Sequence, residues 1–186
     1  MTESGRLMTE SGYQGTSIAR IAAAAGVAPQ TVYNSVGSKR DVLEAVLDRA
    51  AAGPQSPRTV PEFMQERGEH AATAVEFVEQ MADWFTEVHP RLIPVLGLIR
   101  DAAAVDPAIA DLEQARAAQR LRNYGLAAEI LAQKTGARNL PADQVAASLW
   151  SIGHPEVFRQ LEKQGWTSEH YRAWVATTLR AILVVE

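Results

Sequence analysis

The sequence predicts an all-α protein in which an N-terminal three-helix helix-turn-helix domain precedes a larger helical C-terminal domain. Three observations favour this fold class: a helix, tight turn and second helix over residues 12–34; apolar residues at spacings of three and four along most of the remaining chain; and glycine and proline positions that interrupt this periodicity. The 186 residues are 47% hydrophobic and 22% charged, an ordinary composition for a folded globular chain.

The first informative segment contains two short helices and the start of another. Thr16 or Ser17 can accept free N–H groups where the first of these helices begins. Apolar side chains then follow on one face at helical spacing: Ile18, Ile21, Ala22 and Ala25. Gly26 stands where that helix must stop, and Pro29 suits the first turn of the next one. Residues 38–41 open another helix. This arrangement places a short helix where it can enter a groove of DNA.

Hydrogen-bonding side chains crowd the second of these short helices, where they could contact base edges and phosphates: Gln30, Thr31, Tyr33 and Asn34. The stretch from Tyr13 to Arg40 has three basic residues and no acid, although the whole chain has a formal net charge of -4. We therefore expect DNA to meet the one basic stretch of an acidic protein. The alternative interpretation is that these polar residues form only a solvated helix surface.

About thirty residues resemble the N-terminal signature of TetR-family transcriptional regulators, from Thr16-Ser17-Ile18 through Ala25-Gly26-Val27 and Thr31-Val32-Tyr33 to Ser38-Lys39. The resemblance implies an all-helical homodimer that binds DNA with its N-terminal domain and small molecules with its C-terminal domain. It also implies the positions that touch DNA: Ser17, Gln30, Thr31, Tyr33, Ser35 and Lys39. Of these, Tyr33 and Lys39 would mostly hold phosphates, whereas Gln30, Thr31 and Asn34 are expected to face the groove.

Three departures from the family pattern stand out. Ser35 occupies a position where the family often has histidine. Ala28 stands where a serine often caps the recognition helix, and losing such a cap costs about 1 kcal/mol. Only eleven residues precede Gly12, and among them only Leu7 and Met8 are bulky and apolar, so the first helix is expected to be short or to lack its beginning.

A glycine- and proline-rich segment, residues 53–57 with Pro61, predicts the boundary between a DNA-binding domain over residues 1–52 and an effector-binding and dimerisation domain over residues 60–186. Beyond it, apolar spacing predicts a helix from about Val75 that ends before Pro90. Further elements are expected as an apolar stretch over residues 93–105, a helix that starts at Asp106-Pro107 and continues to Gly136, and a helix that opens near Pro141.

The two last helices are expected to carry apolar stripes broader than a surface helix needs. The stripe residues are Val145, Leu149, Trp150 and Ile152 on one helix, and Tyr171, Trp174, Val175, Leu179, Ile182 and Leu183 on the other. The segments 149–150, 155–158 and 165–169 also resemble one large TetR subgroup, in which these helices form a four-helix dimer interface. A dimer would hold two half-sites about 34–36 Å apart. Alternatively, the stripes complete the core of the single protomer.

The resemblance also implies a pocket for a small hydrophobic or aromatic effector. Its expected lining is Trp84, Phe85, Val88, Leu96, Tyr124 and Trp150, with Arg100, Asp101 and His154 as polar candidates. The alternative is that these aromatic and aliphatic side chains only form core. The expected mechanism is a population shift, in which the ligand favours a dimer whose recognition helices are wrongly spaced for DNA.

An enzyme is the competing class, and its motifs are poorly represented. The four histidines lack paired ligand spacing, and there is neither a glycine-rich phosphate loop nor a nucleophile elbow. The chain has no cysteine, no long apolar run and no secretory signal pattern, so we expect a cytoplasmic protein without metal, cofactor or membrane contact. The sequence thus predicts a transcriptional regulator, most simply a repressor that binds a palindromic operator. The alternative is a helical ligand-binding or interaction protein with a degenerate DNA-binding domain.

Overall fold

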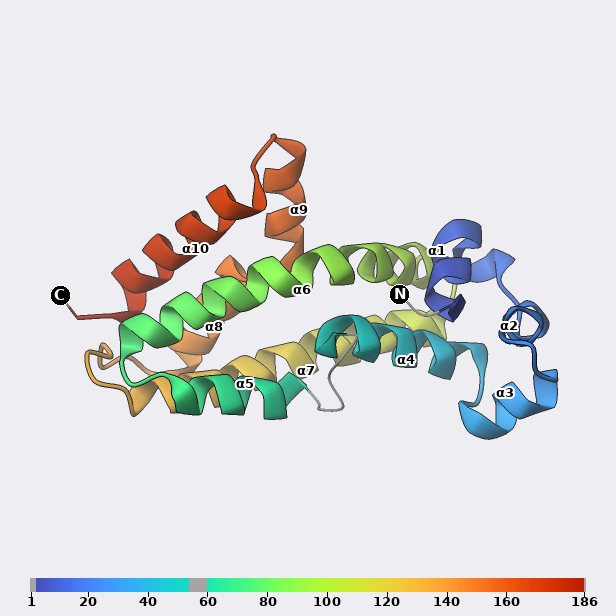
Figure 1. The fold of residues 1–186 in the computed structure, drawn as a ribbon, viewed down its shortest axis with the longest axis horizontal. Coiled ribbons are helices and arrows are strands. Elements are labelled where there is room, and N and C mark those ends of the chain that lie inside the picture. The colour runs from blue at the N-terminus through green and yellow to red at the C-terminus, as the bar shows by residue number, and fades with distance from the viewer. Residues whose placement is uncertain (1–2, 54–59, 186) are drawn as a thin grey trace. The chain divides into compact units, whose positions relative to one another are not determined.

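The computed structural model describes residues 3–53 and 60–185, and in these ranges the chain forms ten helices (Figure 1). They are α1 (Glu3–Gly15), α2 (Ile18–Ala25), α3 (Pro29–Ser35), α4 (Lys39–Ala52), α5 (Val60–His70), α6 (Ala74–Ala103), α7 (Pro107–Ala132), α8 (Ala142–Ile152), α9 (Pro155–Lys163) and α10 (Ser168–Leu183). Two isolated β-bridges are the only extended pairing in the part of the chain described. The predicted all-α class is confirmed.

The helices pack into two compact units. Unit 1 lies within Met1–Ser56 and Arg91–Arg116, and unit 2 within Pro57–Pro90 and Ala117–Glu186. Each of the long helices α6 and α7 therefore contributes one end to unit 1 and the other end to unit 2. The domain boundary expected between residues 52 and 60 stays a prediction.

Unit 1 is built around one apolar cluster. The cluster joins residues from α1 to α4 to the adjoining ends of α6 and α7: Met8, Tyr13, Ile18, Ile21, Ala22, Val32, Val42, Leu43, Val46, Leu47, Val95, Leu98, Ile99, Ala102, Ile109 and Leu112. Polar contacts tie α4 to the long helices within this unit. Arg91 Nε donates to the carbonyl of Ala50 at 3.1 Å, and Arg116 pairs with Asp48 at 3.0 Å. The helix-turn-helix segment is thus part of a larger core.

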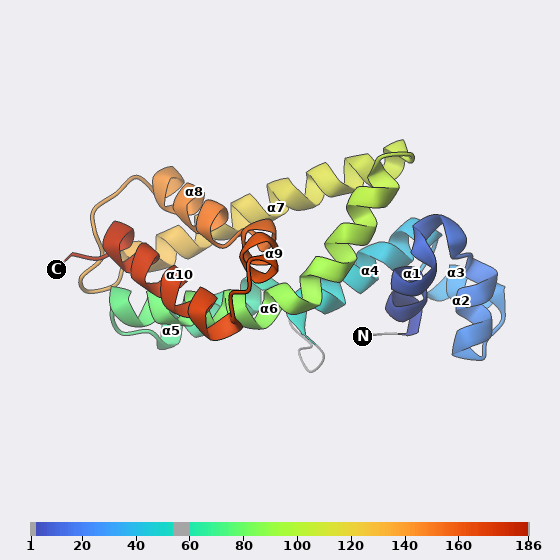
Figure 2. The ribbon, with the colours of Figure 1, turned by 90° about the horizontal axis from the view of Figure 1, so that it is seen from above.

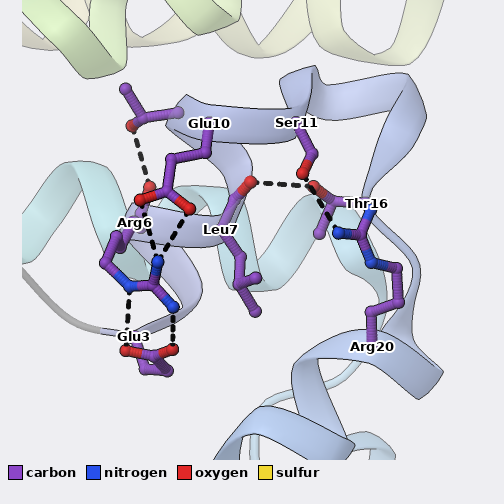
Figure 3. A network of polar contacts seen from close by, with 9 residues as sticks. Glu3, Arg6, Leu7, Glu10, Ser11, Thr16 and Arg20 are labelled. Carbon is purple, nitrogen blue, oxygen red and sulfur yellow. Dashed lines mark hydrogen bonds and ion pairs between the residues drawn. The ribbon is translucent and has the colours of Figure 1, made fainter.

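Helix α1 spans 13 residues and is longer than α2 and α3. Gly12 has a non-helical backbone conformation (φ 72°), which bends α1 before it ends. Met8, one of the few bulky apolar residues of α1, is fully buried and packs in the core cluster of unit 1. The exposed side chain of Arg6 lies between Glu3 and Glu10, at 2.5 and 2.7 Å from their carboxylates (Figure 3).

The prediction that a helix ends before Pro90 is wrong, because α6 continues without interruption from Ala74 to Ala103. Pro90 has no N–H for the carbonyl four residues earlier, and Pro94 repeats the loss. Each interior proline costs about 3 kcal/mol. Burial compensates, since each fully buried apolar side chain contributes about 1.5–3 kcal/mol. The buried residues near the two prolines are Val88, Val95, Leu98 and Ile99.

Three helices, and not the expected two, make up the C-terminal part of the chain. The additional one is α9, which the sequence analysis noted only as a family-like segment. It begins at Pro155, and its N-cap His154 accepts the backbone N–H of Glu156 through Nδ1 at 3.1 Å. Pro155 and Phe158 are buried. After α9, helix α10 runs back beside α8 (Figures 1 and 2).

Most of the predicted stripe residues on α8 and α10 are buried within the single protomer: Val145, Leu149, Tyr171, Val175, Leu179 and Leu183. The other four are half-buried: Trp150, Ile152, Trp174 and Ile182. The stripes therefore serve the core of unit 2 to a large extent, and four side chains keep an accessible surface.

A buried histidine organises the aromatic part of unit 2. His89 is 1% exposed; its Nε2 lies 3.1 Å from the carbonyl oxygen of Gly153 and its Nδ1 lies 3.3 Å from the hydroxyl of Tyr171. A neutral ring satisfies both contacts when Nε2–H donates to Gly153 and Nδ1 accepts from Tyr171. Phe85 stacks on the same ring at 5.5 Å. Burial lowers the pKa of His89 from 6.5 to about 3.

The buried neutral His89 should make the protein acid-labile. Above pH 6.5 the ring is neutral in both the folded and the unfolded chain. Between pH 6.5 and about 3 only the unfolded chain takes up the proton, so the free energy of unfolding falls by up to about 1.4 kcal/mol per pH unit. Urea unfolding of the wild type and His89→Gln across this range measures the effect. Parallel pH profiles for the two proteins would contradict it.

A methyl group at position 153 should overpack the same region. A Cβ added to Gly153 would lie well inside van der Waals contact with the ring of Phe85, whereas one added to Gly125 in α7 would meet nothing within 4 Å. We expect Gly153→Ala to lower the free energy of unfolding by about 1–3 kcal/mol. Gly125→Ala, the matched control, should raise it by about 0.5–1 kcal/mol. Equal unfolding midpoints for the two variants would refute the close packing of Gly153 on Phe85.

Candidate nucleic-acid interface

Helices α2 and α3 form the predicted helix-turn-helix (Figure 1). Ser17 caps α2, because its side chain accepts the backbone N–H of Arg20 at 3.2 Å. Gly26 ends α2 with a left-handed conformation (φ 68°), and the N–H of Val27 bonds back to Ala22 at 3.0 Å. The turn thus has the conformation that glycine adopts at little cost.

Helix α3 has one buried side chain and a polar outer surface. Val32 is 7% exposed and belongs to the core cluster of unit 1. The four residues expected near bases or phosphates on this helix, apart from Tyr33, are exposed: Gln30, Thr31, Asn34 and Ser35. Gln30 Nε2 donates to Asn34 Oδ1 at 2.9 Å, so the structure brings these two predicted residues together. Tyr33 is 52% exposed.

The expected departure at Ala28 is present in the structure. Ala28 is the N-cap of α3 and provides no side-chain hydrogen bond, while Pro29 occupies the first turn. A seven-residue helix is too short to persist by itself. The position of α3 therefore depends on the packing of Val32.

Lys39 lies at the start of α4 and is held by α1. Its Nζ donates to the carbonyl of Tyr13 at 3.1 Å and lies 4.0 Å from the centre of the Tyr13 ring. An ammonium group has three donors, so this contact leaves capacity for another acceptor. The contact between Lys39 and Tyr13 orients the amine before any ligand arrives.

The capping box of α4 adds one acid next to the basic stretch. Asp41 accepts from the hydroxyl and the backbone N–H of Ser38, and these bonds lower the pKa of the Asp41 carboxyl. The two arginines of the stretch also have partners. Arg20 donates to the carbonyl of Gly15 at 2.5 Å and to Ser11 Oγ at 3.2 Å (Figure 3), while Arg40 lies 3.9 Å from Glu44.

The role of Arg20 in joining α2 to α1 was missed, because its partners Gly15 and Ser11 lie on another helix and apolar spacing does not reveal such contacts. Thr16 contributes to the same joint. Its hydroxyl donates to the carbonyl of Gly12 at 2.9 Å, with Leu7 O at 3.4 Å (Figure 3). Arg20 and Thr16 thus fix the orientation of the helix that precedes α3.

The residues predicted to line an effector pocket divide between the two units. Leu96 packs on the core cluster of unit 1. Arg100 and Asp101 also belong to unit 1. The other five belong to unit 2: Trp84, Phe85, Val88, Tyr124 and Trp150. Phe85 and Tyr124 meet edge to face at 6.0 Å, and Trp150 lies 4.9 Å from the ring of His154. Arg120, which the sequence analysis did not single out, lies beside His154.

Two negative observations apply to the described residues. They contain no group of three histidine, cysteine or acidic side chains that could hold a metal ion. None of the helices they form is both long and apolar enough to cross a membrane.

Comparison with known proteins agrees with this geometry. Residues 3–46 match the model of the bacterial regulatory proteins of the tetR family. No curated protein matches the chain.

Several solved structures do match. A proposed transcriptional regulator from Saccharomonospora viridis, in complex with choline, is 18% identical, with 98% of this chain and 94% of that chain covered and a TM-score of 0.64. A proposed fatty acid metabolism regulator from Clostridium perfringens is 14% identical, with 98% and 97% covered and a TM-score of 0.63. The TetR family transcriptional regulator PfmR from Thermus thermophilus is 20% identical, with 99% and 94% covered and a TM-score of 0.61. Residues 3–46 thus resemble the tetR family of bacterial regulatory proteins, and over nearly its whole length the chain has the fold of these solved regulators.

Proposed function

We propose that the chain is a ligand-responsive repressor of the cytoplasm that binds a palindromic operator as a homodimer and is released by a small effector. The observation that supports this most is the polar outer surface of α3, where Gln30 and Asn34 are exposed and bonded to each other while Val32 is buried. As an i,i+4 pair these two amides stabilise α3 by only about 0.2–0.5 kcal/mol, whereas the same amides can read adenine edges in the major groove.

The residues of this surface divide into two roles. Gln30, Thr31 and Asn34 face the bases, and they specify the sequence. Ser17, Tyr33, Ser35 and Lys39 hold phosphates, and they set the position of α3 on the duplex. Lys39 suits this role because Tyr13 already orients its amine.

Dimerisation is proposed through α8 and α10. The half-buried Trp150, Ile152, Trp174 and Ile182 leave apolar surface on these helices that a second copy would cover. A two-fold dimer presents two copies of α3 to two half-sites, and its symmetry makes the operator palindromic.

Unit 2 is proposed to bind the effector. Two structural neighbours support a response to small molecules: the S. viridis protein is in complex with choline, and the C. perfringens protein is named for fatty acid metabolism. An effector that binds one arrangement of the dimer more tightly shifts the population toward it. The dimer is released from DNA if, in that arrangement, the distance between its two α3 helices no longer matches the spacing of the half-sites.

Selection of binding sites from a random pool of duplex DNA tests the proposal. We expect an enriched inverted repeat whose half-sites are about 34–36 Å apart, one helical turn. Enrichment of no sequence would favour the alternative of a degenerate DNA-binding domain.

Removing the phosphate contacts should weaken binding to every duplex. Lys39→Ala and Tyr33→Ala lose backbone contacts, so affinity should fall for selected and scrambled DNA alike. For Lys39→Ala the slope of log affinity against log salt should decrease by about one. Lys163→Ala, an exposed lysine on α9, is the charge-matched control. An unchanged slope in Lys39→Ala would exclude its phosphate role.

Removing a base contact should instead change specificity. Gln30→Ala should reduce discrimination at one base pair of each half-site, by about 1–3 kcal/mol, and leave the salt slope unchanged. Gln133→Ala, at an exposed position after α7, serves as the control. Competition assays with duplexes altered at single positions measure this discrimination. If Gln30→Ala lowers affinity for all duplexes equally, the side chain does not read bases.

A further inference from the structure

Three nitrogen-bearing side chains from different elements meet inside unit 2. Arg120 comes from α7, Trp150 from α8 and His154 from the joint between α8 and α9. Arg120 Nη2 lies 3.0 Å from His154 Nε2, and the guanidinium carbon lies 5.8 Å from the centre of the Trp150 ring. Trp150 meets His154 edge to face at 4.9 Å.

This group has more donors than acceptors. Arg120 Nε and Trp150 Nε1 are both buried, and neither has a hydrogen-bond partner within residues 3–53 and 60–185. His154 Nδ1 accepts the N–H of Glu156 as the cap of α9, so a neutral ring carries its proton on Nε2, which then faces a donor of Arg120. The other neutral tautomer carries its proton on Nδ1, so Nε2 can accept from Arg120, but Nδ1 can no longer accept the N–H of Glu156. In either form, at least three N–H groups have no acceptor among the residues that the structure describes.

The charge is unbalanced as well. Within the part of the chain described, no carboxylate forms an ion pair with Arg120. Glu156, the acid two residues after His154, is paired with Arg159 and accepts from Gln160. Burial lowers the pKa of Arg120, and burial followed by the charge of Arg120 lowers the pKa of His154. A cation in this position needs an anion to neutralise it.

Apolar rings continue from these donors. Tyr124 lies one turn beyond Arg120 on α7, is buried, and meets Phe85 edge to face at 6.0 Å. Burial raises the pKa of Tyr124 to about 12, so its ring adds no charge of its own. A molecule with one anionic end and an apolar body matches both parts of this environment.

We propose that Arg120, Trp150 and His154 form the anion-binding end of a site for a small carboxylic acid whose apolar or aromatic body lies toward Tyr124 and Phe85. A carboxylate offers about four acceptor positions and can accept two hydrogen bonds from one guanidinium. It could therefore accept from the N–H groups of all three side chains. The regulatory role of this site, in which the bound acid is the effector, rests on the proposed function; the binding of the acid does not.

Calorimetric titration and thermal unfolding of the full chain test the site with matched probes. Phenylacetate and octanoate are compared with phenylacetamide and octanamide, which keep the shape and lose the charge. We expect at least one acid to bind and to raise Tm, with its amide about tenfold or more weaker. Binding of neither acid, equal binding of acid and amide, or an equal effect of inorganic sulfate would overturn the proposal.

Variants separate a binding role from a structural one. Arg120→Met should bind the acid about tenfold or more weakly, and its Tm without ligand should stay equal or rise, because a buried unpaired charge has been removed. Arg122→Met, exposed on the same helix, should match the wild type in both respects. Unchanged acid binding by Arg120→Met would overturn the assignment of Arg120.

Measuring DNA affinity with and without the acid distinguishes failure of the site from failure of the proposed function. Acid that binds at Arg120 and leaves DNA affinity unchanged would support the site and contradict its role as an effector site. Specific DNA binding by a protein that binds neither acid would contradict the site alone.

Discussion

The proposed DNA-binding role depends on the burial of one valine. Helix α3 has seven residues, no side-chain cap at Ala28 and only Val32 in the core. Such a helix is stable only through tertiary packing, so the cluster that receives Val32 sets where its polar residues lie. Arg20 joins α2 to α1 by a hydrogen bond to Ser11 (Figure 3) and by another to the carbonyl of Gly15. Thr16, between the two helices, bonds back to the carbonyl of Gly12. Because one inward side chain is enough, the other residues of α3 are free to be polar.

Unit 2 contrasts a satisfied buried polar group with an unsatisfied one. His89 has a partner on each ring nitrogen, Gly153 and Tyr171, and therefore serves as part of the core. Arg120 lies among aromatic rings with an unpartnered Nε. Buried polar groups normally have partners, so a guanidinium that no described carboxylate neutralises supports the proposed ligand site.

Local rules in the sequence predicted much of unit 1. Gly26 and Pro29 mark a helix end and a helix start by their own backbone preferences, and Ser38 caps α4. Long-range packing was beyond such rules. Helix α6 passes Pro90 because buried residues on both sides outweigh the lost bond. Helix α9 was missed although its signals are local, since Pro155 stands in its first turn and Val157, Phe158 and Leu161 follow at helical spacing.

The candidate sites show the same division. The exposed face of α3 could be predicted, since helical spacing alone directs Val32 inward and Gln30 and Asn34 outward. The contact of Lys39 with Tyr13 joins residues far apart in the sequence and could not be predicted. Leu96 packs on the core cluster of unit 1, whereas the other expected pocket residues belong to unit 2, and apolar spacing in the sequence does not reveal this division.

The central claim is that α3 reads a specific DNA sequence. Fluorescence anisotropy of the full chain on a duplex selected from random DNA, against a scrambled duplex of equal length over a range of salt concentrations, tests it most directly. Tight binding of two protomers to the selected duplex alone, weakened steeply by salt, is the predicted result. Equal and weak affinity for both duplexes at every salt concentration would contradict it.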